Sequence, residues 1–292
     1  MKHSFQGNTA ARPEVFASGF QSTEGPAFDR RGNLFVCDMA LKKVFRITPG
    51  GVVSEFIDTL VEGGAQPTGS KFHANGHLFV ADLVRAEVLD VTPDGTMQSV
   101  ARAYRGERLH GPNDLIFASN GDLYFTDPGY SNLQNPYGNV YLLRADGTLQ
   151  QIAGGFALCN GIALSADERT LYVAETYTNL IHHYALDERG LPAGHARFAH
   201  LEGGYGPDGM ALDVEGNLYV AYCEKGVIAV LDPAGELLAE LPAGVEWPTN
   251  LAFWGTSLYI TGEDRVMRLD VGVEGLPVFG SATSSPLRSA LP

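Results

Sequence analysis

The chain has 292 residues, of which 45% are hydrophobic, and its 34 acidic and 20 basic residues give a formal net charge of −14. This acidic balance argues against nucleic acid and anionic membrane surfaces as partners, because both bind a basic face. The size and apolar content are sufficient for a substantial core, and closed all-β folds of this length are commonly one domain.

One pattern recurs six times along the chain: an oxygen-bearing residue, a short apolar strand, a turn and a second apolar strand. We call the oxygen-bearing residues anchors; they are Glu24, Thr68, Asn113, Asn160, Asp208 and Thr249. Successive anchors are 44, 45, 47, 48 and 41 residues apart. A period in the forties, with hairpins and no helical apolar stripe, is typical of a β-propeller. We therefore predict an all-β, six-bladed β-propeller, formed as a single domain over residues 1–292 with tails at 1–12 and 277–292.

In chain order, the first predicted strand is Glu14–Phe20, which precedes the first anchor. By the register of the later repeats it is the outermost strand of the sixth blade, so we expect the N-terminal strand to close the ring. The hairpins after the anchors pair GPAFD with NLFVCD, KFHA with HLFVAD, LIF with LYFTD, GIALS with TLYVAE, GMALD with NLYVAY, and NLAFW with SLYITG. In the third, Asn120-Gly121 predicts a tight turn. Blade three also carries a loop insertion at 128–138, and such loops often bind ligands.

The anchors predict a metal site, because the first strand of each propeller blade lines the central channel and the anchors ring one mouth of it. Four of them carry a carboxylate or carboxamide: Glu24, Asn113, Asn160 and Asp208. Oxygen ligands without His or Cys favour Ca²⁺ or a similar hard cation. Ca²⁺ takes about 6–8 oxygens, so four protein ligands leave positions for water or substrate. The alternatives are that the anchors only fix turns, or that the ion is a structural plug.

A second ring is predicted where the second strands return to the same mouth. Its members are Asp38, Asp82, Asp127, Glu175, Tyr222 and Gly262. The carboxylates either orient ligands, water and substrate, or cap turns and pair with Lys and Arg on the rim. Asp127 is favoured for substrate, because Tyr130 and the blade-three insertion follow it. His110, in the loop before Asn113, either binds substrate or shuttles protons, or simply faces solvent.

Two adjacent histidines, His182 and His183, fall on one predicted strand. They should point to opposite faces, cannot form a facing pair, and are expected to be structural. Three widely spaced cysteines without a CxxC pattern suit a reducing compartment. With no secretory signal and no apolar run of about 18 residues, we expect a cytoplasmic protein.

Five short motifs carry a family resemblance. They are Glu24-Gly25-Pro26, Gly111-Pro112-Asn113-Asp114, Phe125-Thr126-Asp127-Pro128, Asn160-Gly161-Ile162-Ala163 and Gly206-Pro207-Asp208-Gly209. From about Glu14 to Leu269 the chain resembles the SMP-30/gluconolactonase/LRE-like family. The resemblance implies a propeller with a divalent metal in its channel, held by Glu24, Asn160 and Asp208. It implies that Asn113 completes the shell or contacts substrate, and that Asp208 is a base or nucleophile.

The expected function is metal-dependent opening of a lactone, with water activated by Asp208 beside Ca²⁺; Zn²⁺, Mg²⁺ and Mn²⁺ are alternatives. Animal family members that act on aldonolactones carry an arginine where this chain has Gly111, so the resemblance bears on the reaction more than on the sugar. Residues expected to contact substrate are His110, Asn113, Asp127, Tyr130 and Glu175. A phosphotriesterase like diisopropyl-fluorophosphatase, a non-enzymatic ligand-binding propeller and, less favoured, a strictosidine-synthase-like condensing enzyme are the alternatives. We expect a monomer acting on a small-molecule lactone.

Overall fold

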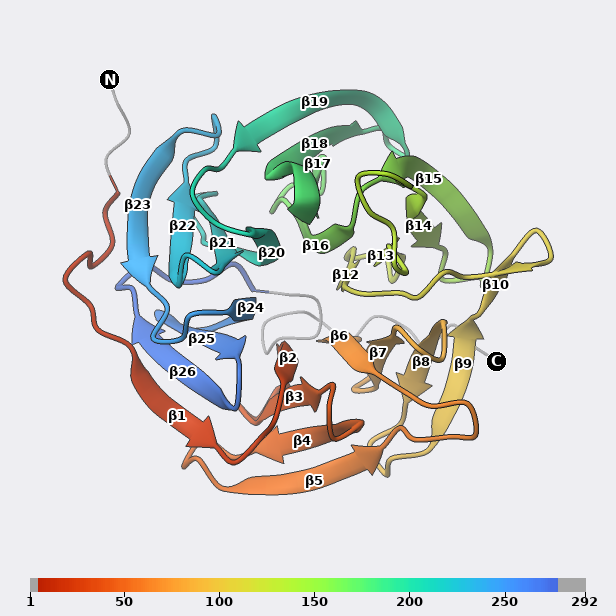
Figure 1. Cartoon of the computed structure of the whole chain (residues 1–292), viewed down its shortest axis with the longest axis horizontal. Coiled ribbons are helices and arrows are strands. Elements are labelled where there is room, and N and C mark those ends of the chain that lie inside the picture. The colour runs from red at the N-terminus through yellow and green to blue at the C-terminus, as the bar shows by residue number, and fades with distance from the viewer. Residues whose placement is uncertain (1–4, 278–292) are drawn as a thin grey trace.

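A computed structural model of the chain describes residues 5–277. It contains six four-stranded antiparallel sheets arranged radially around a central axis (Figure 1). The prediction of an all-β, six-bladed β-propeller is confirmed. Helical structure in the described residues amounts to a single 3₁₀ turn, η1 (Thr176–Thr178), and none of these residues belongs to a helix with the length and apolarity needed to cross a membrane.

Each blade is a meander whose first strand lies nearest the axis (Figure 1). The innermost strands are β2 (Thr23–Phe28), β6 (Pro67–Phe72), β12 (Leu115–Phe117), β16 (Cys159–Leu164), β20 (Gly206–Leu212) and β24 (Pro248–Trp254). The second strands are β3 (Leu34–Asp38), β7 (Leu78–Asp82), β13 (Leu123–Asp127), β17 (Thr170–Glu175), β21 (Leu218–Cys223) and β25 (Ser257–Gly262). The second strands read as nearly continuous apolar runs, such as LFVCD in β3 and LFVAD in β7, because neighbouring blades cover both of their faces.

The two outer positions complete each sheet. The third strands are β4 (Lys43–Ile47), β8 (Glu87–Val91), β14 (Gly138–Leu143), β18 (Leu180–Leu186), β22 (Val227–Leu231) and β26 (Arg265–Asp270). The outermost strands are β5 (Val53–Asp58), β9 (Met97–Ala101), β15 (Leu149–Phe156), β19 (Pro192–His200), β23 (Leu237–Pro242) and β1 (Glu14–Ser18). A small hairpin of β10 (Ala103–Tyr104) and β11 (Glu107–Arg108), which the sequence did not predict, projects between blades two and three.

The turn predicted at Asn120-Gly121 joins β12 to β13 but is longer than a two-residue hairpin. Phe117 pairs with Leu123, and the N–H groups of Ala118 and Gly121 donate to Asp122 O and Ala118 O, at 2.8 and 3.0 Å. Gly121 has φ +89°, which is the left-handed conformation that closes this kind of bulged loop. Glycine is therefore needed here, as predicted, but for a different turn type.

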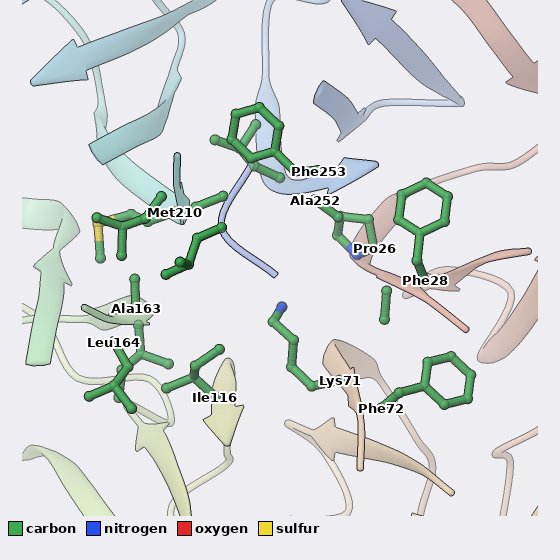
Figure 2. Close-up of a pocket in the computed structure, with 16 residues that line it drawn as sticks. Pro26, Phe28, Lys71, Phe72, Ile116, Ala163, Leu164, Met210, Ala252 and Phe253 are labelled. Atoms are coloured by element: carbon green, nitrogen blue, oxygen red, sulfur yellow. The ribbon is translucent and has the colours of Figure 1, made fainter. Parts of the chain in front are cut away.

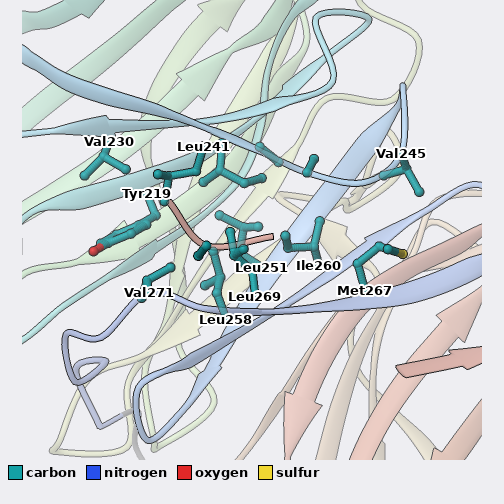
Figure 3. Packing of buried hydrophobic residues seen from close by; sticks show 14 residues of the cluster. Tyr219, Val230, Leu241, Val245, Leu251, Leu258, Ile260, Met267, Leu269 and Val271 are labelled. Atoms are coloured by element: carbon teal, nitrogen blue, oxygen red, sulfur yellow. The ribbon is translucent and has the colours of Figure 1, made fainter. Parts of the chain in front are cut away.

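The core is divided among the interfaces between blades. Figure 3 shows one cluster, in which Tyr219 and Val230 of blade five pack against Leu258, Ile260 and Met267 of blade six. The segment 5–12, expected to belong to a loose tail, also packs here. Ala11 is buried in the cluster, and a backbone hydrogen bond of 2.8 Å joins Asn8 N to Val271 O. The remainder of the two expected tails, 1–4 and 278–292, lies outside the described residues.

The fourth strand of blade six comes from the N-terminal end of the chain. β1 pairs antiparallel with β26, with Glu14 opposite Arg268 and Ser18 opposite Arg265. We expect a chain that begins at residue 19 to melt about 10 °C lower, because β26 becomes an open edge and the apolar contacts of this segment are lost. Thermal unfolding followed by circular dichroism would measure the change.

The matched control for this truncation is Glu14→Gln. It breaks only the exposed ion pair between Glu14 Oε1 and Arg268 Nη2 (2.6 Å), and exposed ion pairs contribute little. We expect its melting temperature to equal that of the full chain. A truncated chain that melts with the full chain would show that the N-terminal strand does not hold the ring closed.

Candidate functional site

The anchors are brought together by close approach of neighbouring innermost strands. Four anchors are followed by glycine: Gly25, Gly69, Gly161 and Gly209. A Cβ on Gly69 would lie 2.6 Å from Asn113 O, and one on Gly161 would overlap Asp208 O. Each of these glycines therefore lets one blade approach the next blade closely at anchor level, which narrows the channel there.

This packing predicts the effect of Gly161→Ala. The added Cβ would collide with backbone of blade five, which cannot move without shifting Asp208. We expect destabilisation of about 2–3 kcal/mol, typical of overpacking, together with loss of metal binding. Chemical denaturation and calorimetric metal titration measure the two effects. Gly147→Ala is the control for adding a methyl group at a glycine, because nothing lies within 4 Å of a Cβ there. Because Gly147 has a positive φ, alanine at this position should lower the stability of the fold, but metal binding should be retained.

Asn160 is held in one orientation by its neighbours. Its Nδ2 donates to Thr176 Oγ1 (3.1 Å), and the Thr176 hydroxyl donates onward to Pro207 O (2.8 Å). With the amide nitrogen engaged, Oδ1 must point the other way. The residue is 7% exposed, and its buried Oδ1 has no hydrogen-bond partner in the part of the chain that the structure describes. A buried amide oxygen normally accepts a hydrogen bond or contacts a cation, so Asn160 Oδ1 is available to either kind of partner.

Asp208 shows the same feature on the neighbouring blade. Its Oδ2 accepts a hydrogen bond from Cys223 Sγ (3.4 Å), whereas the buried Oδ1 has no partner among the described residues. Burial and the nearby Glu24 raise the pKa of Asp208 well above its ordinary value. Two carboxylates that repel each other in a dry environment are expected to take up protons or a cation.

Glu24 completes the pair of carboxylates and is 3% exposed. Its Oε2 accepts hydrogen bonds from Gly25 N (2.5 Å) and Asn250 Nδ2 (3.2 Å). Burial, with a further contribution from the negative charge of Asp114, raises its pKa to about 7. The carboxyl group is therefore poised to exchange its proton for a metal ion near neutral pH.

The donor set fits a hard divalent cation. No cluster of three or more His, Cys, Asp or Glu within residues 5–277 is arranged to hold a metal, but two carboxylates and two carboxamides occupy equivalent positions around the channel. The buried, partnerless Asn160 Oδ1 and Asp208 Oδ1 are the atoms that an ion would satisfy. Asn113, the fourth member, is half-buried, and its backbone N–H donates to Thr126 O (2.9 Å).

The two threonine anchors behave differently from the other four. Thr68 Oγ1 donates to Ala81 O at 3.1 Å, and Thr249 Oγ1 donates to Thr23 O at 2.9 Å. Both hydroxyls therefore join backbone strands of the ring. For these two anchors the structure agrees with the alternative that an anchor only fixes a turn. The carboxylate and carboxamide anchors remain available to bind an ion.

Sequence reasoning missed two buried residues beside the anchors. Asp114 and Asn250 stand one position after their anchors, where the other four blades carry glycine. Asn250 donates to Glu24, and Asp114 Oδ2 accepts from Ile162 N of the next blade (3.3 Å). The sequence signal that could have identified them is that these two repeats lack the glycine that follows the anchor in the other four.

The aspartates of the second ring hold the loops that lead into the channel. Asp127 accepts hydrogen bonds from His110 N (3.0 Å) and Gly111 N (2.7 Å), and it is fully buried. Asp38 accepts from Gln21 N, and Asp82 accepts from Gln66 N, each at 2.8 Å. The geometry supports the turn-capping alternative for all three. Contact between Asp127 and substrate stays a prediction.

Glu175 makes a corresponding bond and one further contact. Its Oε1 accepts from Ala157 N (2.6 Å), and its Oε2 lies 3.0 Å from His182 Nε2. The Nδ1 atom of His182 also lies 2.9 Å from the Nε2 atom of His195. His183 points to the other face, toward Tyr172, as the strand alternation predicted. Contact between Glu175 and substrate likewise stays a prediction.

His110 and Tyr130 form part of an exposed cluster on blade three. The His110 ring contacts Tyr137 edge-on at 4.8 Å, and its Nδ1 lies 3.4 Å from Asn139 Nδ2. Tyr130 is 67% exposed, and its backbone N–H donates to Tyr137 Oη (3.1 Å). Tyr137, which belongs to the blade-three insertion, therefore contacts both His110 and Tyr130. The sequence had suggested these two residues independently as substrate contacts.

Comparison with known proteins identifies the family. The family model described as SMP-30/gluconolactonase/LRE-like region matches residues 22–263. The chain belongs to this family. A gluconolactonase from Zymomonas mobilis is 33% identical over 287 residues, covering 88% of this chain and 80% of that protein. Lactonase drp35 from Staphylococcus aureus (strain MW2) is 34% identical over 238 residues, covering 78% and 71%.

A solved structure agrees with the family assignment. The structure of a gluconolactonase from Xanthomonas campestris superposes with a TM-score of 0.80 at 29% identity, covering 89% of this chain and 90% of that one. The SMP-30/gluconolactonase/LRE-like match begins before the first anchor and ends after the last, so all six anchors fall inside it. The resemblance seen in the short motifs is confirmed.

Proposed function

We propose that this protein is a metal-dependent lactone hydrolase with its catalytic centre at the anchor mouth of the channel. The supporting observation is the pair of buried oxygens, Asn160 Oδ1 and Asp208 Oδ1, for which the structure describes no hydrogen-bond partner within residues 5–277. Glu24, Asn113, Asn160 and Asp208 would hold one divalent ion, with Ca²⁺ expected from the oxygen-only donor set. The relatives named gluconolactonase and lactonase supply the reaction class.

The ion, when bound, would supply a positive charge that stabilises the oxyanion developing on the lactone carbonyl. Asp208 has the basic role: its carboxylate takes a proton from the attacking water, and burial favours a basic carboxyl group. Direct attack by the same carboxylate on the carbonyl carbon is the alternative. When water attacks, the ring oxygen leaves the carbonyl carbon and takes a proton, which gives the hydroxy acid. When Asp208 attacks, the ring oxygen leaves as an acyl anhydride forms with Asp208, and water then hydrolyses this anhydride to release the same hydroxy acid and restore the carboxylate.

The two asparagines bring neutral oxygens to the site, so the only ligand charges are those of Glu24 and Asp208. Thr176 accepts a hydrogen bond from the amide nitrogen of Asn160, so the amide oxygen, and not the nitrogen, would bind the ion. His110 and Tyr130, which the insertion places together, would contact the substrate body, with Asp127 and Glu175 behind them. We further propose a cytoplasmic monomer.

A panel of lactones tests the proposal. Acid release would be measured for sugar lactones and simple aliphatic lactones, with the protein treated with EDTA and then supplied with Ca²⁺. We expect hydrolysis to disappear in EDTA and return with the ion. Phosphotriester hydrolysis without lactone opening would support the phosphotriesterase alternative. The absence of turnover on both substrate classes, with and without metal, would support a binding propeller.

A further inference from the structure

A cavity lies further along the channel, beyond the anchors. It is lined by the later residues of the innermost strands, two to four positions beyond the anchors, and by Leu276 (Figure 2). The empty space is about 630 Å³, including the part open to solvent. The lining is almost wholly apolar and includes Phe28, Ile116, Leu164 and Phe253. Cavities of this kind accept the hydrocarbon body of a small ligand.

One charged group breaks this apolar lining. Lys71 of β6 extends its side chain into the cavity (Figure 2). The residue is 8% exposed, and its Nζ is buried with no hydrogen-bond partner among residues 5–277. An ammonium group has three donors and is costly to bury unless they are used. The cavity therefore contains a cation for which the described part of the chain supplies no acceptor.

The nearest carboxylate does not supply that acceptor. Asp114 Oδ1 lies 3.9 Å from Lys71 Nζ, which is too long for a hydrogen bond. Its two oxygens already accept from backbone N–H groups, Leu115 N to Oδ1 (2.9 Å) and Ile162 N to Oδ2 (3.3 Å). Asp114 offsets the charge of Lys71 at a distance and leaves the donors free.

We propose that this cavity binds a small amphiphilic anion, a carboxylate with a short hydrocarbon or aryl body. The carboxylate would accept hydrogen bonds from Lys71 Nζ, and the apolar body would lie among Phe28, Ile116, Leu164 and Phe253. The site is separate from the anchor mouth and does not depend on the proposed lactonase activity. The negative charges of Glu24 and Asp208 would repel an anion bound at Lys71. A divalent ion held by these two carboxylates would offset their charge, so anion binding should be measured with Ca²⁺ present.

The test uses hexanoate and its neutral isostere hexanamide, titrated into the full chain by calorimetry in buffer containing Ca²⁺. We expect hexanoate to bind about tenfold more tightly than hexanamide, the difference made by charge-assisted hydrogen bonds. Lys71→Met keeps the length of the side chain but removes its charge, so the two ligands should then bind equally. Failure of hexanoate to bind, or equal affinities in the wild type, would show that water alone satisfies Lys71.

A second variant guards against misfolding of Lys71→Met, which leaves Asp114 without a counter-charge. Ala252→Phe fills the cavity from β24 and changes no charge (Figure 2). We expect it to abolish binding of both ligands while circular dichroism stays that of the wild type. Undiminished hexanoate binding to a folded Ala252→Phe protein would place the ligand elsewhere and overturn the proposal.

Discussion

Asp208→Asn is expected to reduce lactone hydrolysis by about 10²–10⁴-fold, the range typical for loss of a general base. Asparagine has nearly the same shape but cannot accept a proton from water. It retains one oxygen that can occupy the position of the partnerless Oδ1, so the fold and part of the metal affinity should survive. Initial rates of acid release at saturating Ca²⁺ would measure the loss.

Two measurements separate this chemical role from simple loss of the ion. Calorimetry would give the Ca²⁺ affinity of Asp208→Asn, and rates would be compared only where both proteins are saturated. Asp264→Asn is the control, because this exposed carboxylate pairs with its neighbour Arg265 and has no other ion pair within residues 5–277. We expect wild-type activity from the control. An Asp208→Asn protein that retains wild-type activity at saturating Ca²⁺ would exclude Asp208 as base and as nucleophile.

The rise in melting temperature caused by Ca²⁺ is expected to be larger at pH 8.5 than at pH 5.5. In the metal-free protein the pKa of Glu24 is raised from 4.5 to about 7, and that of Asp208 is raised too. A carboxyl group with a raised pKa in the folded state contributes stability below its unfolded pKa, and this contribution is lost as pH rises through the folded pKa. For Glu24 the loss is on the order of 3 kcal/mol.

Ca²⁺ reverses this loss because it binds the deprotonated carboxylates and competes with protons. Melting curves in EDTA and in Ca²⁺, recorded at several pH values between 5.5 and 8.5, would show the difference growing with pH. Glu24→Gln removes one titrating group and should flatten that growth. A Ca²⁺ effect that is constant, or larger at low pH, would contradict the assignment of these carboxylates as ligands.

The fold could be read from the sequence because its signal is local and repeated. Each anchor and its two apolar strands lie within about twenty residues, and six copies at similar spacing leave few architectures. Even the departure of the blade-three turn from a two-residue hairpin did not matter, since Gly121 permits either loop. The same regularity placed Glu24, Asn160 and Asp208 in equivalent positions before any contact was known.

The role of the second ring required side-chain directions. Asp127 follows a strand and precedes an insertion in the sequence, which suggested substrate contact. In the structure both of its oxygens accept backbone N–H bonds from the loop before Asn113. The sequence shows which residues end a strand, but rotamers and loop paths decide whether such a carboxylate faces the channel or the backbone.

By itself, the sequence determined the number of blades, the residues at the channel mouth and the family, because these depend on spacing along the chain. The tertiary structure alone decided which side chains meet across the channel. Asn250 bonds to Glu24 although 226 positions separate them, and Lys71 faces an apolar cavity made by all six blades. Such contacts arise only when the blades assemble into a ring, since it is this assembly that brings β24 of blade six against β2 of blade one.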